Sequence, residues 1–135
     1  MICNTACKKW HIGNDIRRIL LSDDEFKKLV GNNIFPLVAP EPKSGQKDLG
    51  TFVVYAREKY SRELSKMAVL EDKCLVSVSV ISDDYDEAVN IAEAIDYALF
   101  GSHKTDCGEF DFNLYDSNET YQDDKYIETL IYEIK

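Results

Sequence analysis

The 135-residue sequence has few of the residues that mark several large classes of protein. Six Gly and three Pro are too few for a collagen-like or disordered chain. The longest charge-free apolar stretch, 29–40, is interrupted by Gly, Asn and Pro and is too short to span a bilayer. Residues 1–10 carry polar side chains where a signal peptide would be apolar. We therefore expect a cytosolic protein.

Cysteine and histidine are also scarce, with four and two residues. Without a secretion signal, the cysteines are expected to be reduced thiols. Cys3, Cys7 and His11 stand four residues apart, as do His103 and Cys107, so helices could present both groups as zinc ligands. Structural zinc sites usually have tighter Cys spacings on turns, and a chain terminus holds geometry poorly. We favour ordinary thiols and surface histidines, and we expect no metal and no cofactor.

Three Asp pairs, at 23–24, 83–84 and 123–124, have the composition of a divalent-cation or acid–base site. The first two follow Ser at predicted helix starts, where carboxylates meet the positive end of the helix dipole. The third lies in a predicted turn, so capping and turn roles are expected for all three. Residues 116–127 open like a calcium loop but have Tyr in place of the required Gly and Ile at position twelve. We expect no calcium site there.

Acidic residues are abundant: 25 Asp and Glu oppose 16 Lys and Arg, for a net charge of −9. Residues 1–81 hold 13 basic and 10 acidic side chains (+3), whereas residues 82–135 hold 3 and 15 (−12). Such a surface repels nucleic acid and anionic lipid. An acidic DNA mimic that inhibits a basic nucleic-acid enzyme is one function compatible with this charge. A carboxylate-dependent hydrolase would need two acids converging in one pocket, which the spacing does not demand.

Hydrophobic periodicity predicts three helices. The first follows apolar positions 12, 16, 19 and 20; the second, 23–30, is opened by a capping box at 22–25 and ended by Gly31. The third is capped by residues 82–84 and stops at Gly101. Its expected apolar stripe is Tyr85, Ala88, Ala92, Ile95 and Leu99, widened by Val89 and Ile91.

Alternating apolar residues predict strands at 51–59, 73–82, 110–115 and 126–134, and an edge strand at 34–38. The clearest is 73–82, in which Cys74, Val76, Val78 and Val80 should face the core. Residues 60–72 fit either a short helix or the tip of a long hairpin. Residues 117–124 are predicted to be a polar turn, and 40–50 a mobile surface arm.

These elements predict a single α+β domain over residues 1–135. We expect an antiparallel or mixed sheet of four to five strands, with two to three helices packed mainly on one face. No phosphate-binding glycine loop, nucleophile elbow or two-histidine zinc helix occurs in the sequence. A non-enzymatic role is therefore expected.

The order of these pieces resembles the small tail-terminator, tail-completion or head–tail joining proteins of long-tailed bacteriophages and prophages. The resemblance spans most of the chain, and the sequence departs from the family at residues 3–11 and 116–124. The pieces that carry it are a leading helix, VGNNIFPLVAP at 30–40, FVVY at 52–55, VSVSV at 76–80, DYDEA at 84–88 and the closing strand pair.

The resemblance implies a virion assembly protein that forms a homohexameric ring at the end of the tail tube, where it terminates the tail and joins it to the head. It implies tail tube and head-connector proteins as partners, passage of DNA without specific binding, and a route from the host bacterial cytoplasm into the virion. In a ring, one face of each subunit contacts a different face of the next. The residue 1–81 part, with a charge of +3, and the residue 82–135 part, with a charge of −12, could supply two such complementary faces. Candidate ring or partner contacts are Glu41, Lys43, Lys47, Arg57, Arg62, Lys66, Asp116, Glu119, Asp123 and Asp124.

Overall fold

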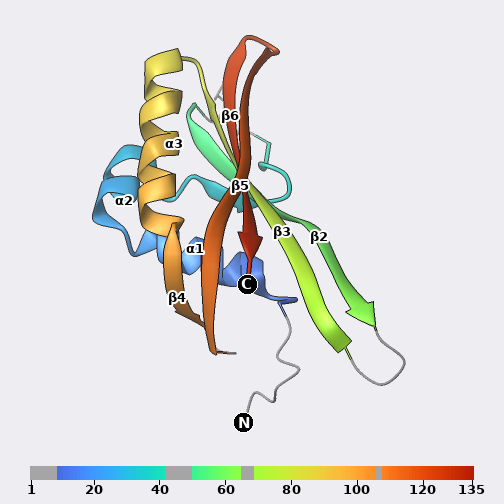
Figure 1. Cartoon of the computed structure of the whole chain (residues 1–135). Coiled ribbons are helices and arrows are strands. Elements are labelled where there is room, and N and C mark those ends of the chain that lie inside the picture. The colour runs from blue at the N-terminus through green and yellow to red at the C-terminus, as the bar shows by residue number, and fades with distance from the viewer. Residues whose placement is uncertain (1–8, 42–49, 65–68, 106–107) are drawn as a thin grey trace.

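The computed structural model describes residues 9–41, 50–64, 69–105 and 108–135 (Figure 1). Most of the predicted arm at 40–50 lies outside these ranges. The elements, in chain order, are α1 (Ile12–Leu21), α2 (Asp24–Val30), β1 (Ile34–Pro36), β2 (Phe52–Leu64), β3 (Val69–Ser82), α3 (Tyr85–Leu99), β4 (Gly101–Thr105), β5 (Gly108–Gln122) and β6 (Lys125–Ile134).

The six strands form one sheet in the order β1-β2-β3-β6-β5-β4. β1 runs parallel to β2, and the other neighbouring strands are antiparallel. The three helices contact one another and lie on one side of the sheet (Figure 1). The α+β class and the mixed sheet match the expectation, but four to five strands was too few. β4 was not predicted because its sequence, GSHKT, has no apolar alternation.

Two helix starts are capped by aspartate, as expected from the Asp pairs. The Asp23 carboxylate accepts a hydrogen bond from the Phe26 amide at 2.9 Å, and Asp84 accepts one from Glu87 at 2.9 Å. The capping residue of α2 is therefore Asp23 and not Ser22, so the helix begins one residue later than predicted. Gly31 follows α2 with a φ of +69°, a backbone conformation that strains other residues.

The core lies between α3 and the centre of the sheet. Cys74, Val76, Val78 and Val80 of β3 are completely buried, which confirms the predicted inward face. The stripe of α3 is rotated relative to the prediction, because Tyr85 is 42% exposed while Ala94 is buried. The fully buried or nearly buried residues of this helix are Ala88, Ile91, Ala94, Ile95 and Leu99.

Two long hairpins extend beyond this core in opposite directions (Figure 1). The β2–β3 hairpin is paired as far as Leu64 and Val69, so residues 60–64 and 69–72 belong to its two strands and the helical alternative was wrong. The β5–β6 hairpin is paired to its last residues, Gln122 and Lys125. The predicted polar turn at 117–124 was therefore wrong except at Asp123 and Asp124, which form the two-residue loop.

The opposite face of the sheet is uncovered by any helix among the described residues (Figure 1). Phe52, Ile81 and Ile127 lie side by side on β2, β3 and β6 and form one apolar row across this face. Ser79 and Thr129 form the next row, and their hydroxyl oxygens are 3.0 Å apart. These side chains are half-buried by their neighbours, which leaves a mixed apolar and hydroxyl surface open.

Candidate functional site

The predicted contact residues are divided between the two hairpins. Arg57 and Arg62 lie on β2, whereas Asp116 and Glu119 lie on β5. Asp123 and Asp124 form the turn that ends the β5–β6 hairpin, and Glu41 is exposed at the end of a described range. Lys43, Lys47 and Lys66 lie outside the described residues. The β2–β3 hairpin, whose first strand carries the two arginines, and the β5–β6 hairpin, which ends in the acidic turn, extend in opposite directions (Figure 1).

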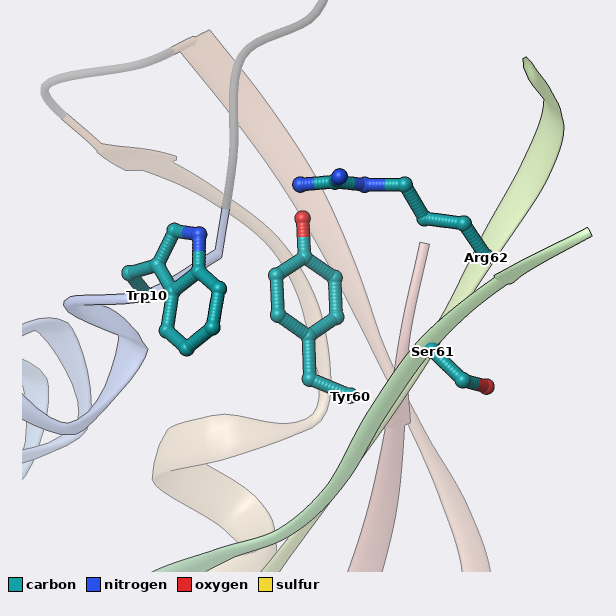
Figure 2. Close-up of a pocket in the computed structure, with 4 residues that line it drawn as sticks. All are labelled: Trp10, Tyr60, Ser61 and Arg62. Atoms are coloured by element: carbon teal, nitrogen blue, oxygen red, sulfur yellow. The ribbon is translucent and has the colours of Figure 1, made fainter.

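Arg62 lines a pocket together with two aromatic rings, Trp10 and Tyr60, and Arg57 lies against the Trp10 ring. Trp10, just before α1, meets Tyr60 of β2 edge-on, with ring centroids 5.4 Å apart. The Arg62 guanidinium lies 5.6 Å from the Tyr60 ring centroid, and Arg57 lies 4.6 Å from that of Trp10. In Figure 2 the indole, the phenol and the Arg62 guanidinium surround one space. This space is an open cavity of about 210 Å³, which we call the arginine–aromatic pocket.

Hydrogen bonds and an ion pair fix the floor of this pocket. The Tyr60 hydroxyl accepts a hydrogen bond from the Lys9 amide at 3.1 Å and donates one to Asp72 at 3.1 Å. Asp72 also pairs with the Lys9 ammonium at 2.7 Å, and the Lys9 side chain is 7% exposed. The Arg57 guanidinium donates to the Trp10 carbonyl at 2.8 Å. Tyr60 and Trp10 are therefore held in place before any partner binds.

A β-bulge places these side chains on one face of the sheet. Arg57 is paired with Val76 and Lys59 with Leu75, so Glu58 is the extra residue. In a regular strand, side chains alternate, and Arg57 would share its face with Lys59 and not with Tyr60. The bulge shifts the alternation by one residue, so that Arg57 and Tyr60 both point to the helix side, as Arg62 does.

The other hairpin carries an acidic end that we call the acidic tip, defined by Glu119, Tyr121, Asp123 and Asp124. A second bulge, at Tyr115, gives Glu119 and Tyr121 the helix-side face. The two aspartates have φ values of +54° and +63°, as the two central residues of a type I′ hairpin turn require. Both are exposed, and Tyr121 is 59% exposed.

Glu119 is paired across the hairpin with Glu128 of β6. Burial, followed by the hydrogen bond with Glu119 and its charge, raises the pKa of Glu128 from 4.5 to about 7. The Tyr85 hydroxyl, at the start of α3, donates to the Glu119 carboxylate at 3.0 Å. That hydrogen bond raises the pKa of the Tyr85 hydroxyl. These contacts tie the acidic tip to α3.

A second open cavity, of about 230 Å³, lies between α3 and the β5–β6 hairpin. It combines the apolar side chains of Val89, Leu114 and Leu130 with the carboxylates of Glu93 and Asp96. Among the described residues that line the two cavities there is no Cys or His. In the described part of the chain, no group of three His, Cys, Asp or Glu side chains is arranged to hold a metal ion.

The proposed zinc groups fall largely outside the described residues, which do not include Cys3, Cys7 or Cys107. His11 is exposed, and the His103 Nε2 atom lies 3.0 Å from the Leu99 carbonyl oxygen. None of the helices that the structure describes is both long and apolar enough to cross a membrane.

Sequence reasoning identified Arg57 and Arg62 but missed Trp10, Tyr60 and Tyr121. Trp10 is the only tryptophan of the chain, and its 55% exposure is unusual for so large an apolar side chain. That single residue, two positions before the first buried isoleucine, Ile12, was a signal in the sequence. Tyr60 could not be placed while 60–72 was ambiguous between a helix and a hairpin.

Comparison with known proteins finds a similarity of fold. No protein-family profile and no curated protein matches the sequence. Among solved structures, the fold is similar to that of a chain described as "Virion of native gene transfer agent (GTA) particle". The TM-score is 0.70 at 20% sequence identity, over 88% of this chain and 89% of the other. At this identity the comparison establishes a shared fold.

Proposed function

We propose that the protein is a structural component of a phage or prophage virion, without enzymatic activity. In this role it self-associates into a ring at the end of the tail tube, terminates the tail and joins it to the head. The observation that carries the proposal is the fold shared, over nearly the whole of both chains, with a chain from a gene transfer agent virion. The order of sequence elements from the leading helix to the closing strand pair supports the same role.

The surface gives physical support. An uncovered sheet face with an apolar row at Phe52, Ile81 and Ile127 is typical of a surface that becomes covered in an assembly. Two exposed aromatic side chains, Trp10 just before α1 and Tyr121 near the end of the β5–β6 hairpin, are of the kind enriched in protein interfaces. Both features suit a subunit that contacts several neighbours.

The charge suits passage of DNA through such a ring. Each copy carries −9, and residues 82–135 contribute all of the excess acidity. An acidic channel wall repels the phosphate backbone over about 8 Å at physiological salt. We therefore expect the ring to let duplex DNA pass without gripping it.

The direct test is the mass of the native chain across concentration, with electron microscopy of any large species. A ring that weakens as salt rises supports the proposal and its electrostatic part. A ring that is indifferent to salt contradicts the electrostatic part, and a chain that is monomeric at every concentration and beside purified tail tubes contradicts the ring. In that case a tight complex with a basic nuclease or transcription factor would identify an acidic DNA mimic instead.

The genetic test is deletion of the gene from the phage or prophage that encodes it. We expect heads and tails that fail to join, with tails of irregular length. Virions that mature normally, or a turnover rate abolished by one substitution, would contradict a structural role. Removing residues 44–47 tests the arm separately, because a well-folded variant that fails to join would assign partner contacts to that segment.

A further inference from the structure

The geometry points to a specific head-to-tail contact: the acidic tip of one copy inserts into the arginine–aromatic pocket of the next. This inference rests on the self-association proposed above and names the two surfaces that meet. The partner that the pocket accepts is thus a second copy of this chain.

The pocket offers what an acidic, aromatic ligand needs. Arg62, which lines the pocket, and Arg57, which lies against the Trp10 ring, form no ion pair with a carboxylate in the described part of the chain. Arginine presents several donors in a plane, which matches carboxylate geometry. The neighbouring Trp10 ring is more than half exposed, so an incoming ring can stack against it.

The acidic tip supplies the complementary groups. Asp123 and Asp124 project from a tight turn, and the exposed Tyr121 ring lies beside them, with its hydroxyl 3.5 Å from Asp124 Oδ1. Tyr121 is packed against Tyr126, with ring centroids 4.8 Å apart, and Tyr126 is packed against Tyr85. The tip is therefore a braced projection and not a loose loop, which lowers the entropic cost of docking.

The two surfaces cannot meet within one chain. The β5–β6 hairpin ends at one extreme of the molecule, and the β2–β3 hairpin extends the other way (Figure 1). The pocket is lined by Trp10, just before α1, and by residues 60–62 of β2. Unlike surfaces at opposite ends generate a heterologous contact, which repeats from copy to copy until it closes. Arginine and aromatic rings also bind nucleic acid. The chain's charge of −9 disfavours that occupant.

Trp10 provides a reporter, because it is the only tryptophan of the chain and lies in the pocket. The first of two full-length chains, the acceptor, carries D123N and D124N and keeps the pocket. Asparagine tolerates positive φ, so its turn is preserved. The second, the donor, carries W10F and R62Q and keeps the tip. In their mixture the only intact contact is the donor's tip in the acceptor's pocket.

We expect the donor to change the acceptor's Trp10 emission saturably, and the mixture to stop at pairs of twice the 15.5 kDa mass. Restoring Arg62 in the donor, as a W10F single variant, rebuilds part of the donor's own pocket, so donor copies should compete for the tips and weaken the response. In the otherwise wild-type chain, R62Q should weaken association about tenfold or more.

Two control donors define specificity. A donor that also carries D123N and D124N should leave Trp10 emission unchanged. A donor that carries D116N instead should act like the parent donor, since Asp116 is equally exposed on β5 but points to the uncovered face. Equal responses from both control donors would overturn the contact.

The outcomes separate this contact from the proposed function. A wild-type ring together with an unresponsive donor–acceptor mixture overturns the contact and leaves the ring. A responsive mixture together with virions that mature without the protein supports the contact and overturns the virion role. A single-stranded oligonucleotide that changes Trp10 emission at physiological salt, where the donor does not, would make the pocket a nucleic-acid site.

Discussion

Glu119 and Glu128 face each other across the β5–β6 hairpin as a directly paired set of carboxyl groups. One oxygen of Glu128 is buried without a partner among the described residues. Two ionised carboxylates at such positions repel each other, so the pair keeps a proton at pH values where an ordinary glutamate has lost it.

We expect this pair to make stability depend on pH. The pKa of Glu128 is raised from 4.5 to about 7, so the folded state retains a proton that the unfolded chain releases above pH 4.5. The pair's contribution to stability is therefore present below pH 4.5 and is lost as the pH rises to about 7. Glu128→Gln should flatten this decline and stabilise the fold above pH 7 by about 0.2–1 kcal/mol.

The measurement is urea unfolding of wild type and variant across this pH range. Glu93→Gln is the matched control, because Glu93 is an exposed carboxylate on α3 and should leave the slope unchanged. Parallel pH profiles for wild type and E128Q would show that the two carboxyl groups titrate independently.

The Tyr132 hydroxyl donates a 2.6 Å hydrogen bond to Asp96 and so links β6 to α3. Tyr132 is fully buried, and burial raises the pKa of its hydroxyl. Tyr132→Phe should lower the free energy of unfolding by about 1–3 kcal/mol, because Asp96 loses a donor in a half-buried position. Tyr97→Phe on the same helix is the control, since Tyr97 is 86% exposed. Equal unfolding midpoints for wild type and Tyr132→Phe would show that this hydrogen bond does not stabilise the fold.

The turn at Asp123 and Asp124 holds two non-glycine residues at positive φ. Asp124→Gly should therefore stabilise the hairpin by up to about 1 kcal/mol, as glycine adopts this conformation without Cβ strain. Asp124→Asn should be nearly neutral. Thermal unfolding of the three proteins measures the difference, and a destabilised glycine variant would mean that the Asp124 side chain contributes more than its backbone costs.

Cys74 is completely buried, and that burial raises the pKa of its thiol to about 11. Because the thiolate is the reactive form, native protein should resist alkylation at this position. The test is a variant with Ser in place of Cys3, Cys7 and Cys107, followed by mass spectrometry. We expect labelling no faster than global unfolding and complete labelling in denaturant. Rapid labelling of the native variant would reveal local opening of β3.

The core of the fold could be predicted because its signals are local. Val76, Val78 and Val80 alternate on one strand, and this period of two directly identifies the inward face. The caps at Asp23 and Asp84 likewise follow from their position before apolar stripes. In both cases the pattern that carries the prediction lies within a few consecutive residues.

The two hairpin ends could not be predicted in the same way. Residues 116–122 are polar and exposed, so the strand there has no apolar alternation to reveal it. The bulges at Glu58 and Tyr115 each shift the alternation by one residue, and a regular period of two assigns the side chains beyond them to the wrong face. The arginine–aromatic pocket depends on the first of these bulges, and the acidic tip on the second.

The sheet that separates the two hairpins also sets the direction in which each points. Neighbouring strands of a sheet are rotated relative to one another. Because β3 and β6 are neighbours in the sheet, this twist sets the angle between the β2–β3 hairpin and the β5–β6 hairpin. If copies join end to end through these hairpins, that turn is added at every junction. The number of subunits in a closed ring is then determined by the geometry of the strands. Substitutions at the junction would change the affinity between subunits without changing their number.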